Sequence, residues 1–147
     1  METKAEIAVD LFNKGFNCAQ AVFTSHCEEY NLPDDIGKKV ACGFGAGMGR
    51  TGETCGAVTG GIMLIGLRYG QAENFGHEVK EKIYALVQEY TGKFKAEFGS
   101  VNCTELVKYD LGKKEELLKA RNAGVFKHLC PLLVKRSVEL IEEILEA

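Results

Sequence analysis

One stretch of the sequence, from Val40 to Gly70, constrains the fold more than any other part. It contains ten of the seventeen glycines and two of the six cysteines of this 147-residue chain, and it is the least polar segment. From about Glu53 to Tyr69 it is apolar almost all round, as expected of a buried helix. Each glycine inside such a helix costs about 1 kcal/mol relative to alanine, so close packing against neighbouring backbones must offset this cost. We therefore expect a buried glycine-rich helix at the centre of the fold.

The segments on both sides of this stretch show the three- and four-residue apolar spacing of amphipathic helices. Together with cap and stop residues, this spacing predicts helices at about residues 3–14, 18–30, 33–40, 53–69, 74–98, 102–109, 113–122 and 125–147. Asn17 is the expected N-cap of the second helix, Gly99 is expected to end the helix at 74–98, and Ser100 or Asn102 is expected to cap the next one. Pro131 must kink the last helix or mark its true start. The alternating glycines of residues 43–50 indicate a loop or a closely packed helix end. The prediction is an all-α fold, a single-domain bundle of about seven or eight helices.

Composition and charge exclude several classes of function. The chain is 46% hydrophobic and 27% charged, as in globular proteins, and its net charge of −3 argues against nucleic-acid or anionic-membrane partners. The N-terminus lacks the apolar run of a signal peptide, and no apolar segment is long enough to span a membrane. We therefore expect a cytoplasmic protein. In that reducing compartment, metal binding, redox chemistry or packing explains the cysteines better than structural disulfides do.

The cysteines themselves lack C-x-x-C spacing, so any shared site must be assembled from distant helices. Four of them, Cys18, Cys55, Cys103 and Cys130, are expected at or near helix N-termini. Unpaired N–H groups and the helix dipole favour a thiolate there and can lower a cysteine pKa from about 8.5 to roughly 3.5–7.5. A thiolate is both a redox nucleophile and a ligand for soft metals, so these four residues are the predicted catalytic or metal-binding set. Cys27, on an ordinary helix face, is expected to serve only in packing.

The glycine-rich loop is a weaker candidate for binding. Gly45, Gly47 and Arg50 lie in GFGAGMGR, but no strand precedes this segment and no Gly-Lys-Ser/Thr follows, so it is neither a P-loop nor a Rossmann turn. Close helix packing is the favoured role of the glycines, while Arg50 is also suited to bind an anion or to hold a thiolate. Cys42 adjoins this loop. These four residues are the predicted cofactor-binding set.

The order of the cysteines and the glycine-rich block resembles the redox-active protein family C_GCAxxG_C_C. The resemblance rests on GFNCAQAV, GFGAGMGRTGETCGAVTGGIMLIGL, VNCTELVKYDL and HLCPLLV, and it spans about residues 15–135. It departs from the family name at one point, because Thr54 precedes Cys55 and Gly56 follows it, where the name implies Gly-Cys-Ala. The resemblance implies a small helical protein with a thiol or metal redox role.

Three functions remain open at this point. In the first, the four cysteines converge and either bind an iron–sulfur cluster or another thiophilic metal, or cycle between dithiol and disulfide. The protein would then be an oxidoreductase or electron carrier with a small-molecule or protein redox partner. In the second, the chain is a non-catalytic helical subunit with structural cysteines. In the third, it binds a small anion with the glycine-rich loop and Arg50. The apolar stripe from Phe75 to Phe98 and the C-terminal apolar face also allow a homodimer.

Overall fold

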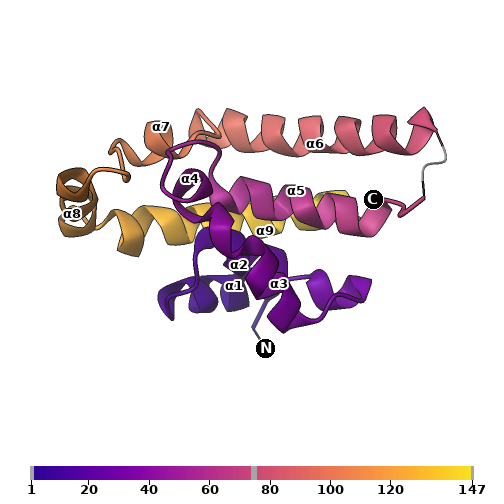
Figure 1. The fold of residues 1–147 in the computed structure, drawn as a ribbon, viewed down its shortest axis with the longest axis horizontal. Helices are drawn as coiled ribbons and strands as arrows, with labels where there is room; N and C mark the ends of the chain where they lie inside the picture. The colour runs from indigo at the N-terminus through magenta and orange to yellow at the C-terminus, as the bar shows by residue number, and fades with distance from the viewer. Residues whose placement is uncertain (1, 74–75, 147) are drawn as a thin grey trace.

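The computed structural model describes residues 2–73 and 76–146, and within these residues it contains helices and no strand (Figure 1). The helices are α1 (Lys4–Asn13), α2 (Cys18–Thr24), α3 (Asp34–Ala41), α4 (Gly45–Met48), α5 (Gly56–Tyr69), α6 (His77–Phe98), α7 (Cys103–Val107), α8 (Lys114–Asn122) and α9 (Cys130–Glu146). Some of these helices are connected by short turns: the 3₁₀ turns η1 (Cys27–Tyr30) and η2 (Cys42–Phe44), and the π-helical turn η3 (Val125–Leu129). The all-α prediction is confirmed. None of the helices in the described residues has the length and apolarity needed to cross a membrane.

Side-chain caps set the starts of several helices where the sequence predicted them. Thr3 and Asn17 each form a capping box, in which the cap side chain accepts a hydrogen bond from the backbone N–H three residues later. Asn102 caps α7 with its side chain, which accepts a hydrogen bond from the N–H of Glu105 at 3.0 Å. The long helix α6 ends at Gly99, which adopts a left-handed conformation. Its expected start at Asn74 and Phe75 lies outside the described residues.

Two predicted helices differ from those observed. The helix expected over 18–30 breaks after Thr24, where the hydroxyl of Ser25 donates to the carbonyl of Val22 and contacts Nδ1 of His26. Such local side-chain bonds compete with helical backbone bonds, so the chain continues only as the short turn η1. In the last helix, the π-helical turn η3 precedes α9, which begins one residue before Pro131. A proline lacks the N–H that would bond four residues back, and the wider turn occurs at this point.

The glycine-rich helix α5 packs closely against α2, as expected, but it is not buried on every side. A Cβ added at Gly60 would lie 2.9 Å from the carbonyl oxygen of Ala19, so only glycine allows this approach of the two backbones. Gly56 and Gly60 are both buried, whereas Ile62, Met63 and Leu67 of the same helix are partly exposed. The helix also begins at Gly56 instead of Glu53. It therefore packs against α2, α6 and α9 but is not a fully enclosed central helix.

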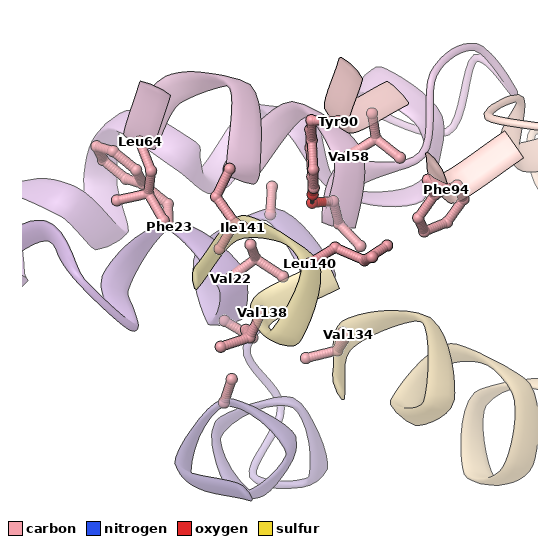
Figure 2. Packing of buried hydrophobic residues seen from close by; sticks show 14 of the residues in the cluster. Val22, Phe23, Val58, Leu64, Tyr90, Phe94, Val134, Val138, Leu140 and Ile141 are labelled. Atoms are coloured by element: carbon pink, nitrogen blue, oxygen red, sulfur yellow. Dashed lines mark hydrogen bonds between the residues drawn. The ribbon is translucent and has the colours of Figure 1, made fainter. Parts of the chain in front are cut away.

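The main hydrophobic core lies between α2, α5, α6 and α9 (Figure 2). Its labelled side chains are Val22, Phe23, Val58, Leu64, Tyr90, Phe94, Val134, Val138, Leu140 and Ile141. The buried hydroxyl of Tyr90 donates a 3.0 Å hydrogen bond to the carbonyl of Ala57, which satisfies the one polar atom that this ring brings into the core. A second, smaller cluster includes Cys103 and Cys130 and involves α7, α8, η3 and the start of α9. In Figure 1 these elements form the left end of the molecule.

Candidate functional site

A cavity of about 460 Å³ lies at the end of the molecule where α7 and α8 meet the starts of α2, α5 and α9. All four cysteines of the predicted catalytic set line this cavity: Cys18, Cys55, Cys103 and Cys130. Most of the remaining wall is apolar and comprises Phe12, Phe16, Leu106, Val107, Leu111, Leu117, Phe126 and Leu133. The structure thus brings together thiols that are separated by as many as 112 positions in the sequence.

A short backbone pairing places Cys55 beside Cys103. Thr54 and Asn102 form an isolated antiparallel bridge, in which the N–H of Cys55 donates to the carbonyl of Val101 at 2.7 Å. The N–H of Cys103 donates to the carbonyl of Glu53, also at 2.7 Å. These bonds hold the start of α5 against the start of α7. They also explain why α5 begins three residues later than predicted, because residues 53–55 pair with another segment instead of forming a helical turn.

Cys18 is positioned by the glycine-rich loop and by α5. The side-chain amide of Asn17, the residue before it, donates to the carbonyl of Cys42 at 2.8 Å and fixes the start of α2 to the loop. A Cβ added at Gly45 would lie 2.6 Å from the Cβ of Asn17, and one at Gly56 would lie 2.9 Å from Sγ of Cys18. Glycine is therefore needed at both positions for α5 and the loop to reach the Cys18 sulfur.

The Cys18 thiol is the acidic one of the four. The pKa of Cys18 is lowered from 9.0 to about 7, chiefly because the Cys55 thiol hydrogen-bonds to its sulfur. Backbone N–H groups of Ala46, Cys18 itself and Ala19 also favour the thiolate, and together these contacts outweigh the opposing effect of burial. The same hydrogen bond raises the pKa of Cys55 well above 9.0, with burial and the negative charge of Cys18 acting in the same direction. Of these two coupled thiols, Cys18 is therefore the more acidic.

The expectation of a lowered pKa is wrong for the other three cysteines. Burial raises the pKa of Cys103 to about 11 and that of Cys130 to about 12, and the negative charge of Cys18 adds to both increases. Cys130 also lacks a free helix start, because its N–H already bonds to the carbonyl of Val125 within η3. Loss of hydration at these thiols outweighs any favourable interaction with a helix end.

The predicted cofactor-binding set is divided by the structure. Arg50 lines the cavity, whereas Cys42 is exposed and does not. Gly45 and Gly47 are buried and contact protein instead of the cavity; at Gly47 an added Cβ would lie 2.6 Å from the Cβ of Cys103. Their role is close packing, the favoured interpretation of the sequence. Cys27 is fully buried in the main core, away from the cavity, in keeping with a packing role.

Sequence reasoning missed two residues of the cavity wall. Arg121, in the last turn of α8, and Lys127, in η3, both line the cavity together with Arg50. In the sequence they belong to charged helix faces that are typical of solvated surfaces, and no local motif distinguishes them. Only the tertiary fold places them in the wall of the same cavity as Cys18.

The arrangement does not fit a chelated metal. Within residues 2–73 and 76–146, no three His, Cys, Asp or Glu side chains lie close enough together to share an ion. A structural zinc or an iron–sulfur cluster needs about four protein ligands around one centre, so the four thiols here line a common cavity without forming such a centre. All six cysteines are free thiols.

A comparison with known protein families gives a match over most of the chain. A family model described as "Putative redox-active protein (C_GCAxxG_C_C)" matches residues 16–144, which is most of the chain and includes all four cavity cysteines. Searches of curated proteins and of solved structures each found no match.

Proposed function

Because this chain belongs to the C_GCAxxG_C_C family of redox-active proteins, we propose that it performs thiol–disulfide exchange. Cys18 is the attacking thiolate and Cys55 is the thiol that resolves the mixed disulfide. The observation that carries this proposal is the place of both thiols in one cavity wall, where the Cys18 sulfur packs against Gly56, the residue after Cys55. Exchange requires a thiolate that attacks and a second thiol near enough to resolve the mixed disulfide.

The acidity of Cys18 suits the attacking role. With a pKa of about 7, roughly half of Cys18 is thiolate at neutral pH. An attacking thiol is most effective when its pKa is near the ambient pH, because a lower value also reduces its nucleophilicity. Cys55, Cys103 and Cys130 keep their protons at this pH, since their pKa values are all raised. Attack therefore begins at one sulfur of the four.

The exchange proceeds in two steps. The Cys18 thiolate attacks one sulfur of a substrate disulfide, forms a mixed disulfide, and releases the other half of the substrate as a thiolate. The Cys55 thiol then loses its proton to that released thiolate or to water and attacks the Cys18 sulfur. The second half of the substrate leaves as a thiolate. The substrate disulfide has gained two electrons, and Cys18 and Cys55 have lost two in forming their disulfide.

This dithiol form accounts for the arrangement better than the cluster form does. A cluster needs its thiol ligands around one point, whereas among residues 2–73 and 76–146 no three such side chains lie close enough together to share an ion. Cys103 and Cys130 complete the wall as neutral thiols, where their low polarity suits a largely apolar cavity.

A single-turnover reaction with bis(2-hydroxyethyl) disulfide tests the proposal. In the reduced wild-type protein at pH 7, we expect peptide mass spectrometry to find a disulfide between Cys18 and Cys55. In Cys55→Ser the reaction should stop at a mixed disulfide on Cys18, and in Cys18→Ser it should not proceed at this pair. Cys42→Ser is the matched control, because Cys42 is exposed but outside the cavity. Initial modification of Cys55, Cys103 or Cys130 instead of Cys18 would refute the assignment, as would an unchanged product in Cys55→Ser.

A further inference from the structure

The cavity wall carries three positive charges and, among the described residues that line it, no aspartate or glutamate. The three cations are Arg50, Arg121 and Lys127. This local balance is the opposite of that of the whole chain, which has 21 acidic and 18 basic residues. The positive charge is therefore a property of this cavity and not of the chain as a whole.

These cations, Arg50, Arg121 and Lys127, also form no ion pair with the acidic residues that the structure describes. The acids of the α7–α8 segment that form ion pairs, Asp110 and Glu116, do so with Lys113 instead. The three charges therefore remain available to an incoming anion.

The positions of the cations fit a ligand that is apolar in one part and anionic in another. All three residues line the cavity and are exposed, whereas the aromatic and aliphatic residues of its wall are buried or half-buried. They come from three separate elements, the loop after α4, the end of α8, and η3. A ligand whose apolar part reaches Cys18 would hold its charged ends among them.

We propose that the disulfide attacked by Cys18 is a small molecule bearing carboxylates, which the three cations attract and orient. This inference rests on the proposed thiol–disulfide exchange and adds the class of substrate. The electron balance is that of the two steps above: the carboxylate-bearing disulfide is reduced to two thiols, and the Cys18–Cys55 disulfide forms. The attraction is a charge effect that acts over about 8 Å at physiological ionic strength, so it contributes both to encounter and to binding.

Three small disulfides of similar length but different charge show whether the charge of the substrate affects its rate of reaction with Cys18. Dithiodipropionate is anionic, bis(2-hydroxyethyl) disulfide is neutral, and cystamine is cationic. Their single-turnover rates with Cys18 are measured at low ionic strength in the wild type and in the double variant Arg121→Gln/Lys127→Gln. We leave Arg50 unchanged because its positive φ of 67° places it in a strained loop, where a substitution would also alter the backbone.

We expect the double variant to lose about five- to tenfold in rate with dithiodipropionate, a change within the range of electrostatic steering. Its rate with the neutral disulfide should be unchanged, and its rate with cystamine should rise. The matched control is Lys80→Gln/Lys95→Gln, which removes the same charge from exposed positions outside the cavity. An equal loss in this control, or an unchanged ratio of anionic to neutral rates in the cavity variant, would overturn the inference.

A second measurement tests anion binding without any exchange. Suberate matches dithiodipropionate in chain length but has no disulfide, and 1,8-octanediol is its neutral counterpart. We expect suberate, but not the diol, to slow alkylation of Cys18 in the wild type, and this protection should be lost in Arg121→Gln/Lys127→Gln. Protection by suberate without exchange on any disulfide would refute the proposed function while retaining the anion site. Exchange without protection or charge preference would retain the function and refute this inference.

Discussion

The main core and the cysteine cavity use the same residue types for different purposes. In the core, Cys27 is fully buried, and burial followed by the charges of Asp34 and Glu28 raises its pKa. At the cavity, Cys18 is partly exposed, and its pKa is lowered by a neighbouring thiol and by backbone N–H groups. The two sulfurs lie only nine positions apart in the sequence. Reactivity therefore follows from the donors that surround a thiol and not from its place in the chain.

The glycines differ between the two regions in a similar way. In the core, Gly60 and Gly61 allow side chains and backbone of α2 and α6 to touch α5 directly. At the cavity, Gly45, Gly47 and Gly56 fix the loop and the helix starts while leaving a space of about 460 Å³ beside them. In the core, the glycines allow close packing, whereas at the cavity they position the loop and the helix starts around an open space.

The largest expected contrast is in the rates at which the two cysteines are alkylated. At pH 7 about half of Cys18 but less than about 1% of Cys27 is thiolate, and full burial slows Cys27 further. We expect Cys18 to react with iodoacetamide on the order of 10³ times faster than Cys27, as followed by peptide mass spectrometry in a Cys42→Ser background. Similar rates for the two residues would remove the distinction between core and cavity thiols.

A substitution at Gly61 tests how tightly the core is closed. An added Cβ at Gly61 would clash with the ring and hydroxyl of Tyr90, so Gly61→Ala must displace this side chain and weaken its hydrogen bond to Ala57. We expect the free energy of unfolding to fall by about 2–3 kcal/mol, measured by urea denaturation.

Gly66→Ala is the matched control in the same helix. Nothing lies within 4 Å of a Cβ added at Gly66, so this variant should gain up to about 1 kcal/mol from helix propensity. If both alanine variants changed stability in the same direction, close approach at Gly61 would not explain the need for glycine there.

Alkaline unfolding tests the neutral thiols of the cavity. Cys103 and Cys130 keep their protons in the folded state up to pKa values of about 11 and 12, whereas in the unfolded chain they ionise near 9.0. Their contribution to stability is therefore present below pH 9 and lost as pH rises above it, by up to about 1.4 kcal/mol per pH unit for each thiol. Cys18 acts in the opposite sense, since its folded pKa is the lower one, and it adds stability as pH rises from 7 to 9.

Urea denaturation under reducing conditions across pH 7 to 10.5 measures these opposing effects. We expect stability to decline above pH 9 in the wild type and to decline less steeply in Cys130→Ala. Cys42→Ala, at the exposed cysteine, should decline as the wild type does. A steeper decline in Cys130→Ala than in the wild type would contradict the raised pKa of Cys130.

Much of the fold followed from local signals. Asn17, Asn102 and Gly99 set helix ends where their cap or stop chemistry predicted them. The four cavity cysteines also formed one set in the sequence, because all four lie at or near expected helix starts. Their acidities could not be predicted in this way, because a pKa depends on burial and on neighbours that sequence spacing does not reveal.

The differences between the predicted and the observed helix α5 are both caused by contacts with distant segments of the chain. The bridge between Thr54 and Asn102 shortens α5 at its start, and the neighbouring helices leave Ile62 and Met63 of α5 partly exposed. Neither effect has a local signal, since each depends on which distant segment lies beside the helix.

The sequence by itself determined an all-α chain, the capped ends of its helices, and the need for close packing around a glycine-rich segment. These properties depend on residues a few positions apart, through hydrogen bonds and side-chain periodicity that act locally. Only the tertiary structure decided that Cys18 is the most acidic cavity thiol, that Cys103 and Cys130 stay neutral, and that Arg121 and Lys127 join Arg50 at one cavity. Hydrogen bonding, desolvation and charge act over a few ångströms in space, and folding alone brings these distant residues within that range.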